Sequence, residues 1–196
     1  MSELGYRLIA LGLSMAYMLV RGVSERRLGR ASKYATLKNA DPRDRRELLV
    51  LSVVVIPQWL YMLTPWLDFA AMGFPDAVRW LGAVITALGV AAFAWTHATL
   101  AGNWSPVIES PPEGELITTG PYRWVRHPMY TSFFIYNAGM VLLTSNWLAG
   151  PLVFLAFVWM YFDRVGREEA MMLDTFGDKY ARYAENTGRL FPRFGR

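Results

Sequence analysis

The chain contains no cysteine, only two histidines and few charged residues. The absence of Cys excludes disulfides, thiolate nucleophiles and Cys-based zinc sites. Because His97 and His127 are the only imidazoles, a metal site would need carboxylates for most of its ligands, so we expect no metal. Charged residues make up 18% of the chain, against about 25% in a typical soluble domain. Hydrophobic residues make up 54%, and the length of 196 residues predicts a single domain, residues 1–196.

Five apolar segments predict an all-α integral membrane protein. The expected transmembrane helices are residues 6–22, 48–67, 79–100, 128–144 and 146–163, followed by a cytoplasmic helical tail. The last two are shorter than the roughly 20 residues that a full span prefers. Only Thr144, Ser145 and Asn146 separate their apolar cores, which predicts a tight antiparallel hairpin. The alternative for this pair is a hairpin inside a soluble core.

Lys and Arg alternate between the connections of these segments. Eight lie between the first and second segments, none between the second and third, two between the third and fourth, and seven after the fifth. The positive-inside rule therefore places the N-terminus outside and the C-terminus in the cytoplasm, in a multi-pass protein of the cell membrane. Because the basic residues cluster between apolar runs, we expect membrane lipids rather than nucleic acid as their partners.

The first candidate site precedes the fourth segment. Pro128 suits the first position of a helix and disfavours the helical conformation for His127. His127 then lies beside the unpaired N–H groups and positive end of that helix, where a cofactor carboxylate would be stabilised. The alternative is a basic interfacial loop in which Arg126 and His127 face lipid headgroups.

The second candidate site follows the fifth segment. Arg164 and Glu168 lie four residues apart on one helical face, where the carboxylate can hold an ammonium group and the guanidinium a substrate anion. Glu169 is expected to point elsewhere. The alternative is a solvated face with a local ion pair. Both sites flank the same hairpin, so we expect them to be neighbours at the membrane–cytosol boundary. The sequence contains no G-x-G-x-x-G motif after a predicted strand and no P-loop. It therefore gives no support for a soluble nucleotide-binding enzyme.

Several motifs in the second half of the chain form a recognisable series. They are Gly102-Asn103-Trp104-Ser105, Gly120-Pro121-Tyr122, Arg126-His127-Pro128-Met129-Tyr130, Ser145-Asn146-Trp147, Glu168-Glu169, Phe176-Gly177-Asp178-Lys179-Tyr180 and Thr187-Gly188-Arg189-Leu190-Phe191-Pro192. In these motifs the chain resembles the isoprenylcysteine carboxyl methyltransferase family, specifically its short five-span prokaryotic members. The resemblance covers residues 102–192 and implies that this region binds S-adenosylmethionine.

The resemblance also implies roles for individual residues. The cofactor-binding residues would be Glu115, Leu116, Ile117, Tyr122, His127, Pro128, Met129, Tyr130 and Glu168. Glu109 aligns with a further cofactor contact, in a loop whose length differs from the family's. Arg164 would face the substrate, and His127 would be the base if the acceptor needs one.

The acceptor itself stays open. The first choice is a lipophilic carboxylate, such as an isoprenylcysteine, that enters from the bilayer. The alternatives are a phospholipid amine, a thiol, or a non-catalytic membrane protein that binds lipid.

Overall fold

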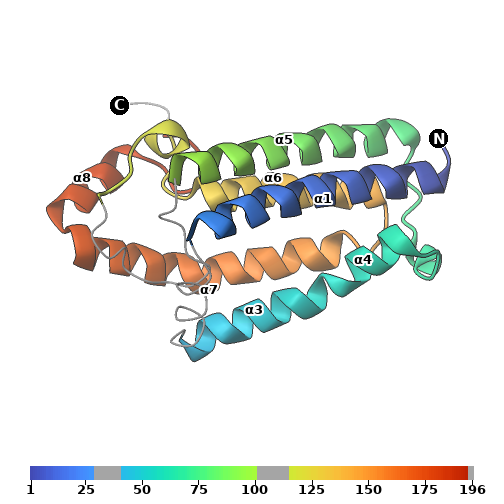
Figure 1. Ribbon diagram of the computed structural model, residues 1–196, viewed down its shortest axis with the longest axis horizontal. Helices are drawn as coiled ribbons and strands as arrows, with labels where there is room; N and C mark the ends of the chain where they lie inside the picture. The colour runs from blue at the N-terminus through green and yellow to red at the C-terminus, as the bar shows by residue number, and fades with distance from the viewer. Residues whose placement is uncertain (29–40, 101–114, 194–196) are drawn as a thin grey trace.

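The computed structural model describes residues 1–28, 41–100 and 115–193 and is helical in these ranges, with two isolated β-bridges and no strand. The α-helices are α1 (Glu3–Leu28), α3 (Pro42–Val54), α4 (Ile56–Leu63), α5 (Asp76–Leu100), α6 (Pro128–Thr144), α7 (Pro151–Phe176) and α8 (Asp178–Asn186), and the 3-10 helices are η1 (Asp68–Ala70) and η2 (Gly120–Arg123). In Figure 1 the long helices run along the longest axis, with the N-terminus at one end and α8 at the other. The predicted all-α architecture is confirmed.

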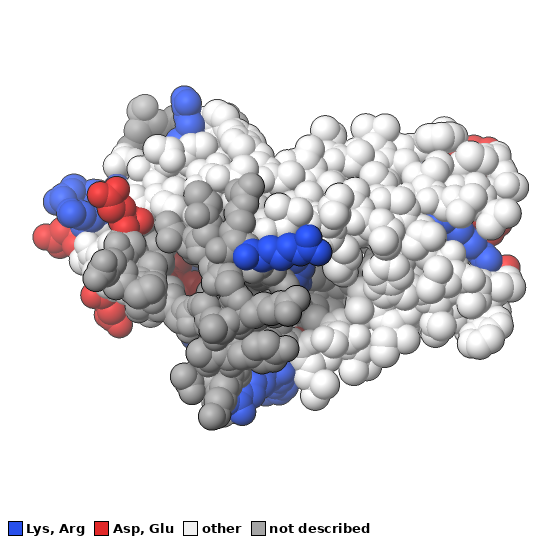
Figure 2. Space-filling view, viewed as in Figure 1, with Lys and Arg blue, Asp and Glu red and all other residues white. Residues whose placement is uncertain are grey.

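Within residues 1–28, 41–100 and 115–193, three helical segments are long and apolar enough to cross a membrane. They are Glu3–Ser24, Pro42–Leu63 and Asp76–Leu100, which match the first three predicted spans. Helix α6 coincides with the fourth predicted segment, and α7 contains most of the fifth; whether these two helices cross the membrane stays a prediction. On the face drawn in Figure 2, red and blue side chains lie at both ends of the molecule and one blue side chain lies near the middle, while the stretch to the right of it is largely white.

The predicted helix boundaries differ most from the observed ones in the second and fifth spans. The second span, expected as one helix over residues 48–67, begins earlier, as α3, and is interrupted at Val55 before α4 ends at Leu63. Pro57 explains the interruption, because it has no N–H to donate to the carbonyl four residues earlier. The last helix begins at Pro151 rather than 146 and continues without a break to Phe176, so the predicted hairpin has a longer connection.

Helices α5 and α6 form the closest packing in the bundle, and glycines make it possible. A Cβ added at Gly89 would lie 2.5 Å from the backbone N of Tyr136, and one at Gly139 would lie 2.4 Å from the backbone N of Thr86. Small residues allow helix backbones to approach in this way in membranes, where van der Waals packing drives helix association. The contact fixes α6, and hence His127 at its start, relative to α5.

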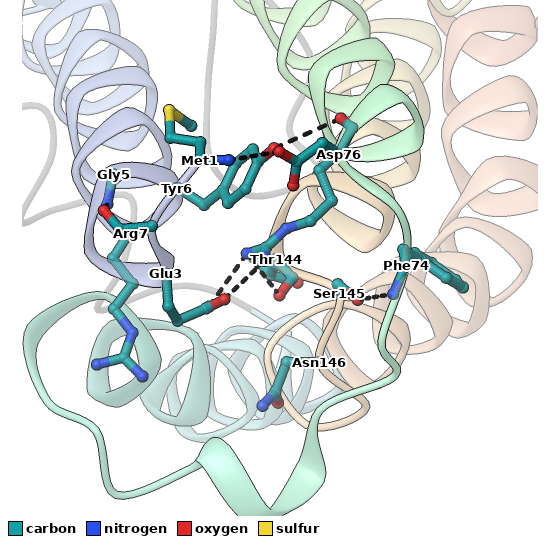
Figure 3. A network of polar contacts seen from close by, with 12 residues as sticks. Met1, Glu3, Gly5, Tyr6, Arg7, Phe74, Asp76, Thr144, Ser145 and Asn146 are labelled. Carbon is teal, nitrogen blue, oxygen red and sulfur yellow. Dashed lines mark hydrogen bonds and ion pairs between the residues drawn. The ribbon is translucent and has the colours of Figure 1, made fainter.

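Arg79 on α5 holds the opposite end of the bundle together. Its Nε donates to the carbonyl of Leu143 at the end of α6 (3.0 Å), and its Nη1 donates to Glu3 Oε2 on α1 (2.6 Å). Figure 3 shows this end of the bundle, with Glu3 of α1 beside Thr144 at the end of α6. Its guanidinium lies 3.7 Å from the ring centroid of Tyr6, and Tyr61 on α4 donates to Glu3 Oε1 (2.6 Å). This network joins α1, α4, α5 and α6 and caps the C-terminal carbonyls of α6.

Substituting Gly89 by Ala should destabilise the bundle by about 1–3 kcal/mol, because backbone atoms of α6 would have to move to admit the methyl group. The matched control is Gly12→Ala in α1, where an added Cβ has open space, so its stability should stay near that of the wild type. Thermal unfolding in detergent measures both. Equal melting temperatures for the two variants would contradict the close approach of α5 and α6.

Candidate active site

The first candidate site is built on the start of α6. This helix begins at Pro128, and His127 stands before it with non-helical angles (φ −122°, ψ 59°), as the sequence predicted. The 3-10 turn η2 and the residues up to Arg126 lead the chain into this position. His127 is buried and so lies inside the protein rather than facing lipid headgroups.

The C-terminal tail returns to this loop and pairs with it. Helix α7 ends at Phe176, where Gly177 adopts a positive φ of 52°, and α8 follows. Beyond α8 the backbone N of Arg126 donates to the carbonyl of Gly188 (2.7 Å), and the backbone N of His127 donates to the carbonyl of Arg189 (3.0 Å). The two regions are therefore neighbours, which confirms the prediction from their positions around the hairpin.

Glu168 lies in the centre of the second candidate site. Its Oε1 accepts hydrogen bonds from Tyr130 Oη on α6 (2.6 Å) and from Arg164 Nε on α7 (3.2 Å). Its Oε2 lies 3.6 Å from His127 Nδ1. The predicted pairing of Arg164 with Glu168 at four-residue spacing is confirmed, and Arg164 is buried. This pair is therefore part of a buried cluster and not a solvated helix face.

Glu169 belongs to the same cluster, which corrects the expectation that it points elsewhere. Its Oε1 accepts from Arg126 Nη2 (2.9 Å) and lies 3.3 Å from His127 Nε2, and its Oε2 accepts from Arg189 Nη2 (2.6 Å). Burial by itself raises the pKa of Glu169, but the contacts with His127, Arg189 and Arg126 outweigh burial and hold this pKa well below its ordinary value. His127 therefore lies between two carboxylates that are adjacent in sequence.

The remaining predicted cofactor residues have less definite places. Tyr122 is half-buried, and its carbonyl accepts a hydrogen bond from Tyr183 Oη of α8 (2.6 Å). Pro128 is buried, and Met129 packs against the main apolar core. Among the described contacts, none joins residues 115–117 (Glu115, Leu116 and Ile117) to the cluster around Glu168. Glu109 and the motif at residues 102–105 lie outside the described residues.

A second group of charges on α3 was not identified from the sequence. Asp44 and Glu47 are 1% and 0% exposed, and both bind Arg167, with Asp44 Oδ1 2.7 Å from Arg167 Nη1. Glu47 Oε2 also lies 3.5 Å from Arg164 Nη1. The sequence feature that could have identified this group is the spacing of its members. The two acids on α3 are three residues apart, and so are the two arginines on α7.

This combination defines a helical membrane protein with a cluster of buried, paired charges at one end of its bundle. Residues 80–174 match the profile of the isoprenylcysteine carboxyl methyltransferase (ICMT) family. Over this stretch, just under half of its length, the chain is therefore similar to a family whose members are integral membrane proteins.

Individual relatives cover more of the chain. A protein-S-isoprenylcysteine O-methyltransferase of Tribolium castaneum is 29% identical over 147 residues, which are 69% of this chain and 52% of the relative. The enzyme of the same name from Schizosaccharomyces pombe is 41% identical over 78 residues, 39% of this chain and 33% of the relative. A nickel-cobalt-cadmium resistance protein, NccN of Alcaligenes xylosoxydans xylosoxydans, is 32% identical over 115 residues, 58% of this chain and 53% of the relative. The chain thus spans about half the length of the Tribolium castaneum and Alcaligenes xylosoxydans xylosoxydans relatives and a third of the Schizosaccharomyces pombe one.

A solved structure supports the fold. The structure of a eukaryotic intramembrane Ras methyltransferase, ICMT, aligns with a TM-score of 0.59 at 22% identity, over 94% of this chain and 67% of that one. At this identity the comparison supports the fold alone. The helices of this chain are therefore arranged as in a protein known to act inside a membrane.

Replacing Glu168 by Gln should weaken the binding of S-adenosylhomocysteine by about 1.5–3 kcal/mol, roughly 10- to 150-fold in Kd, because a charged hydrogen bond to the ligand ammonium is lost. Isothermal titration calorimetry of the purified protein measures the change. Glu169→Gln is the matched control: its carboxylate is occupied by Arg126 and Arg189, so we expect a lower melting temperature and a much smaller loss of affinity. If the two variants bind alike, Glu168 is not the ammonium site.

Proposed function

We propose that this chain is an integral membrane methyltransferase that uses S-adenosylmethionine to methylate a carboxylate on a lipophilic acceptor, such as an isoprenylcysteine. The observation that carries the proposal is the shared cluster of Arg164 and Glu168, a cation and an anion of α7 that both lie near the start of α6. The names of the relatives that match over the same region, protein-S-isoprenylcysteine O-methyltransferases, support the same reaction.

The donor groups near α6 fit the amino-acid portion of S-adenosylmethionine. Glu168 offers a carboxylate to an ammonium group, and it is partly exposed while Arg164 beside it is buried. The first-turn N–H groups of α6, at Met129 and Tyr130, have no acceptor within their own helix and favour a carboxylate. When bound, this cofactor supplies a methyl group on a positively charged sulfur, already activated for displacement.

Arg164 is the residue we assign to the acceptor. It lies one helical turn closer to the apolar part of α7 than Glu168, on the side from which a lipophilic molecule would arrive. Its guanidinium can bind an acceptor carboxylate through two parallel hydrogen bonds and so fix the direction of attack. A carboxylate is ionised at neutral pH and needs no base. An amine or thiol acceptor would need one, and His127, beside Glu168, would take that role.

The proposal places this cluster at the cytoplasmic boundary of the membrane, because Lys and Arg are concentrated in the connections at this end. A topology of five spans with the N-terminus outside agrees with this distribution of Lys and Arg. Reporter fusions after Pro75 should then give an extracytoplasmic signal, and fusions at Arg196 a cytoplasmic one. A cytoplasmic signal at Pro75 would contradict the proposed orientation.

Arg164→Ala should leave S-adenosylhomocysteine affinity nearly unchanged and reduce methyl transfer to a lipophilic acid sharply, by at least about tenfold in kcat/KM. The reason is that the substitution removes the group that orients the acceptor while Glu168 keeps its contact with Tyr130. Calorimetry and a methyl-transfer assay on the same preparation separate the two effects.

Arg164→Lys is the matched variant for this experiment. It keeps the charge without the planar fork, so it should restore activity only in part. A loss of cofactor affinity in the Ala variant as large as that of Glu168→Gln would make Arg164 a structural residue. Undiminished methylation of a thiol or an amine by the Ala variant would show that the acceptor is not a carboxylate.

A further inference from the structure

Two pairs of opposite charges face each other between α3 and α7. Asp44 and Glu47 are one turn apart on α3, and Arg164 and Arg167 are one turn apart on α7. Residues three apart share a helical face, so each helix presents its two charges to the other. Figure 1 shows α3 alongside α7. Helix α3 lies outside residues 80–174, so the acidic side of this contact comes from the part of the chain that the family profile does not match.

Glu47 divides its two oxygens between the two arginines. Its Oε1 accepts a hydrogen bond from Arg167 Nη2, and its Oε2 lies 3.5 Å from Arg164 Nη1. Asp44, by contrast, accepts from Arg167 Nη1 at 2.7 Å. Arg167 thus fixes the carboxylate of Glu47, and that carboxylate in turn faces the guanidinium of Arg164.

This arrangement has an electrostatic cost that calls for an explanation. Removing a carboxylate from water is unfavourable unless its partner and geometry compensate. Glu47 is fully buried, and its Oε2 faces Arg164 Nη1 at 3.5 Å. Asp44 connects α3 to α7 separately, through Arg167.

We propose that Glu47 is a positioning residue for the acceptor, acting through Arg164. The inference rests on the proposed function, in which Glu168 is engaged by the cofactor's ammonium. Glu47 is then the carboxylate that keeps the Arg164 guanidinium oriented whether or not cofactor is bound. Helix α3 thereby contributes to acceptor recognition, although it carries none of the motifs of the second half of the chain.

The test compares Glu47→Gln with Asp44→Asn in purified full-length protein, with N-acetyl-S-prenylcysteine as the acceptor. Both substitutions remove one buried carboxylate, and with it one negative charge, from the same face of α3. We expect Glu47→Gln to raise the acceptor KM about tenfold or more while changing kcat by less than about threefold. Asp44→Asn should lose thermal stability to a similar extent but keep the acceptor KM within about twofold. Both should bind S-adenosylhomocysteine as the wild type does.

Glu47→Asp is the second variant, because it keeps the charge but draws it back by one methylene. Its acceptor KM should lie between those of the wild type and Glu47→Gln. An unchanged KM in Glu47→Gln, or an equal rise in Asp44→Asn, overturns the inference and leaves the proposed function in place. Loss of S-adenosylhomocysteine binding in both Glu47 variants shows a structural role and also overturns it. A wild-type protein that methylates no lipophilic acid overturns the proposed function and this inference together.

Discussion

A charge that is removed from water needs a partner of opposite charge, and this requirement determines the structure of the end of the molecule where the candidate site lies. The part of α7 beyond its apolar stretch carries Arg164, Arg167, Glu168 and Glu169, and each of them contacts a charged or polar group on another segment. Arg167 binds α3, Glu168 binds the first turn of α6, and Glu169 binds the loop before α6 together with the tail. A helix that was merely amphipathic would not bring these four segments to one place. The pairing of buried charges therefore assembles the site.

The bundle gives this assembly a fixed frame. The glycine contacts between α5 and α6 leave no room for a side chain between the two backbones, and Arg79 ties the far end of α6 to α1. Because α6 is held along its length and at its end, the position of His127 and Tyr130 at its start is determined by packing far from them. A site that must align a methyl donor with an acceptor depends on such rigidity, since small displacements are costly in rate.

The sequence predicted much of this and missed what depends on three-dimensional partners. The apolar segments and Pro128 correctly indicated the helices and the start of α6. The second span was expected as one helix but is interrupted at Val55, because Pro57 removes a backbone hydrogen bond from the helix. The expectation that Glu169 points away from the site was wrong. Its position on the helix does not show that Arg126 and Arg189, from distant segments, bind its carboxylate. Asp44 and Glu47 were missed for the same reason.

The central claim is that this site transfers a methyl group to a carboxylate, and the bond formed distinguishes the possibilities. Wild-type protein in phospholipid nanodiscs would be incubated with methyl-labelled S-adenosylmethionine and a lipophilic acid, and the labelled lipid then treated with mild base. A methyl ester releases its label as methanol, whereas an N-methyl or S-methyl product keeps it. The account predicts base-labile label that depends on the added acid. Label that withstands base, or no transfer at all, would contradict it.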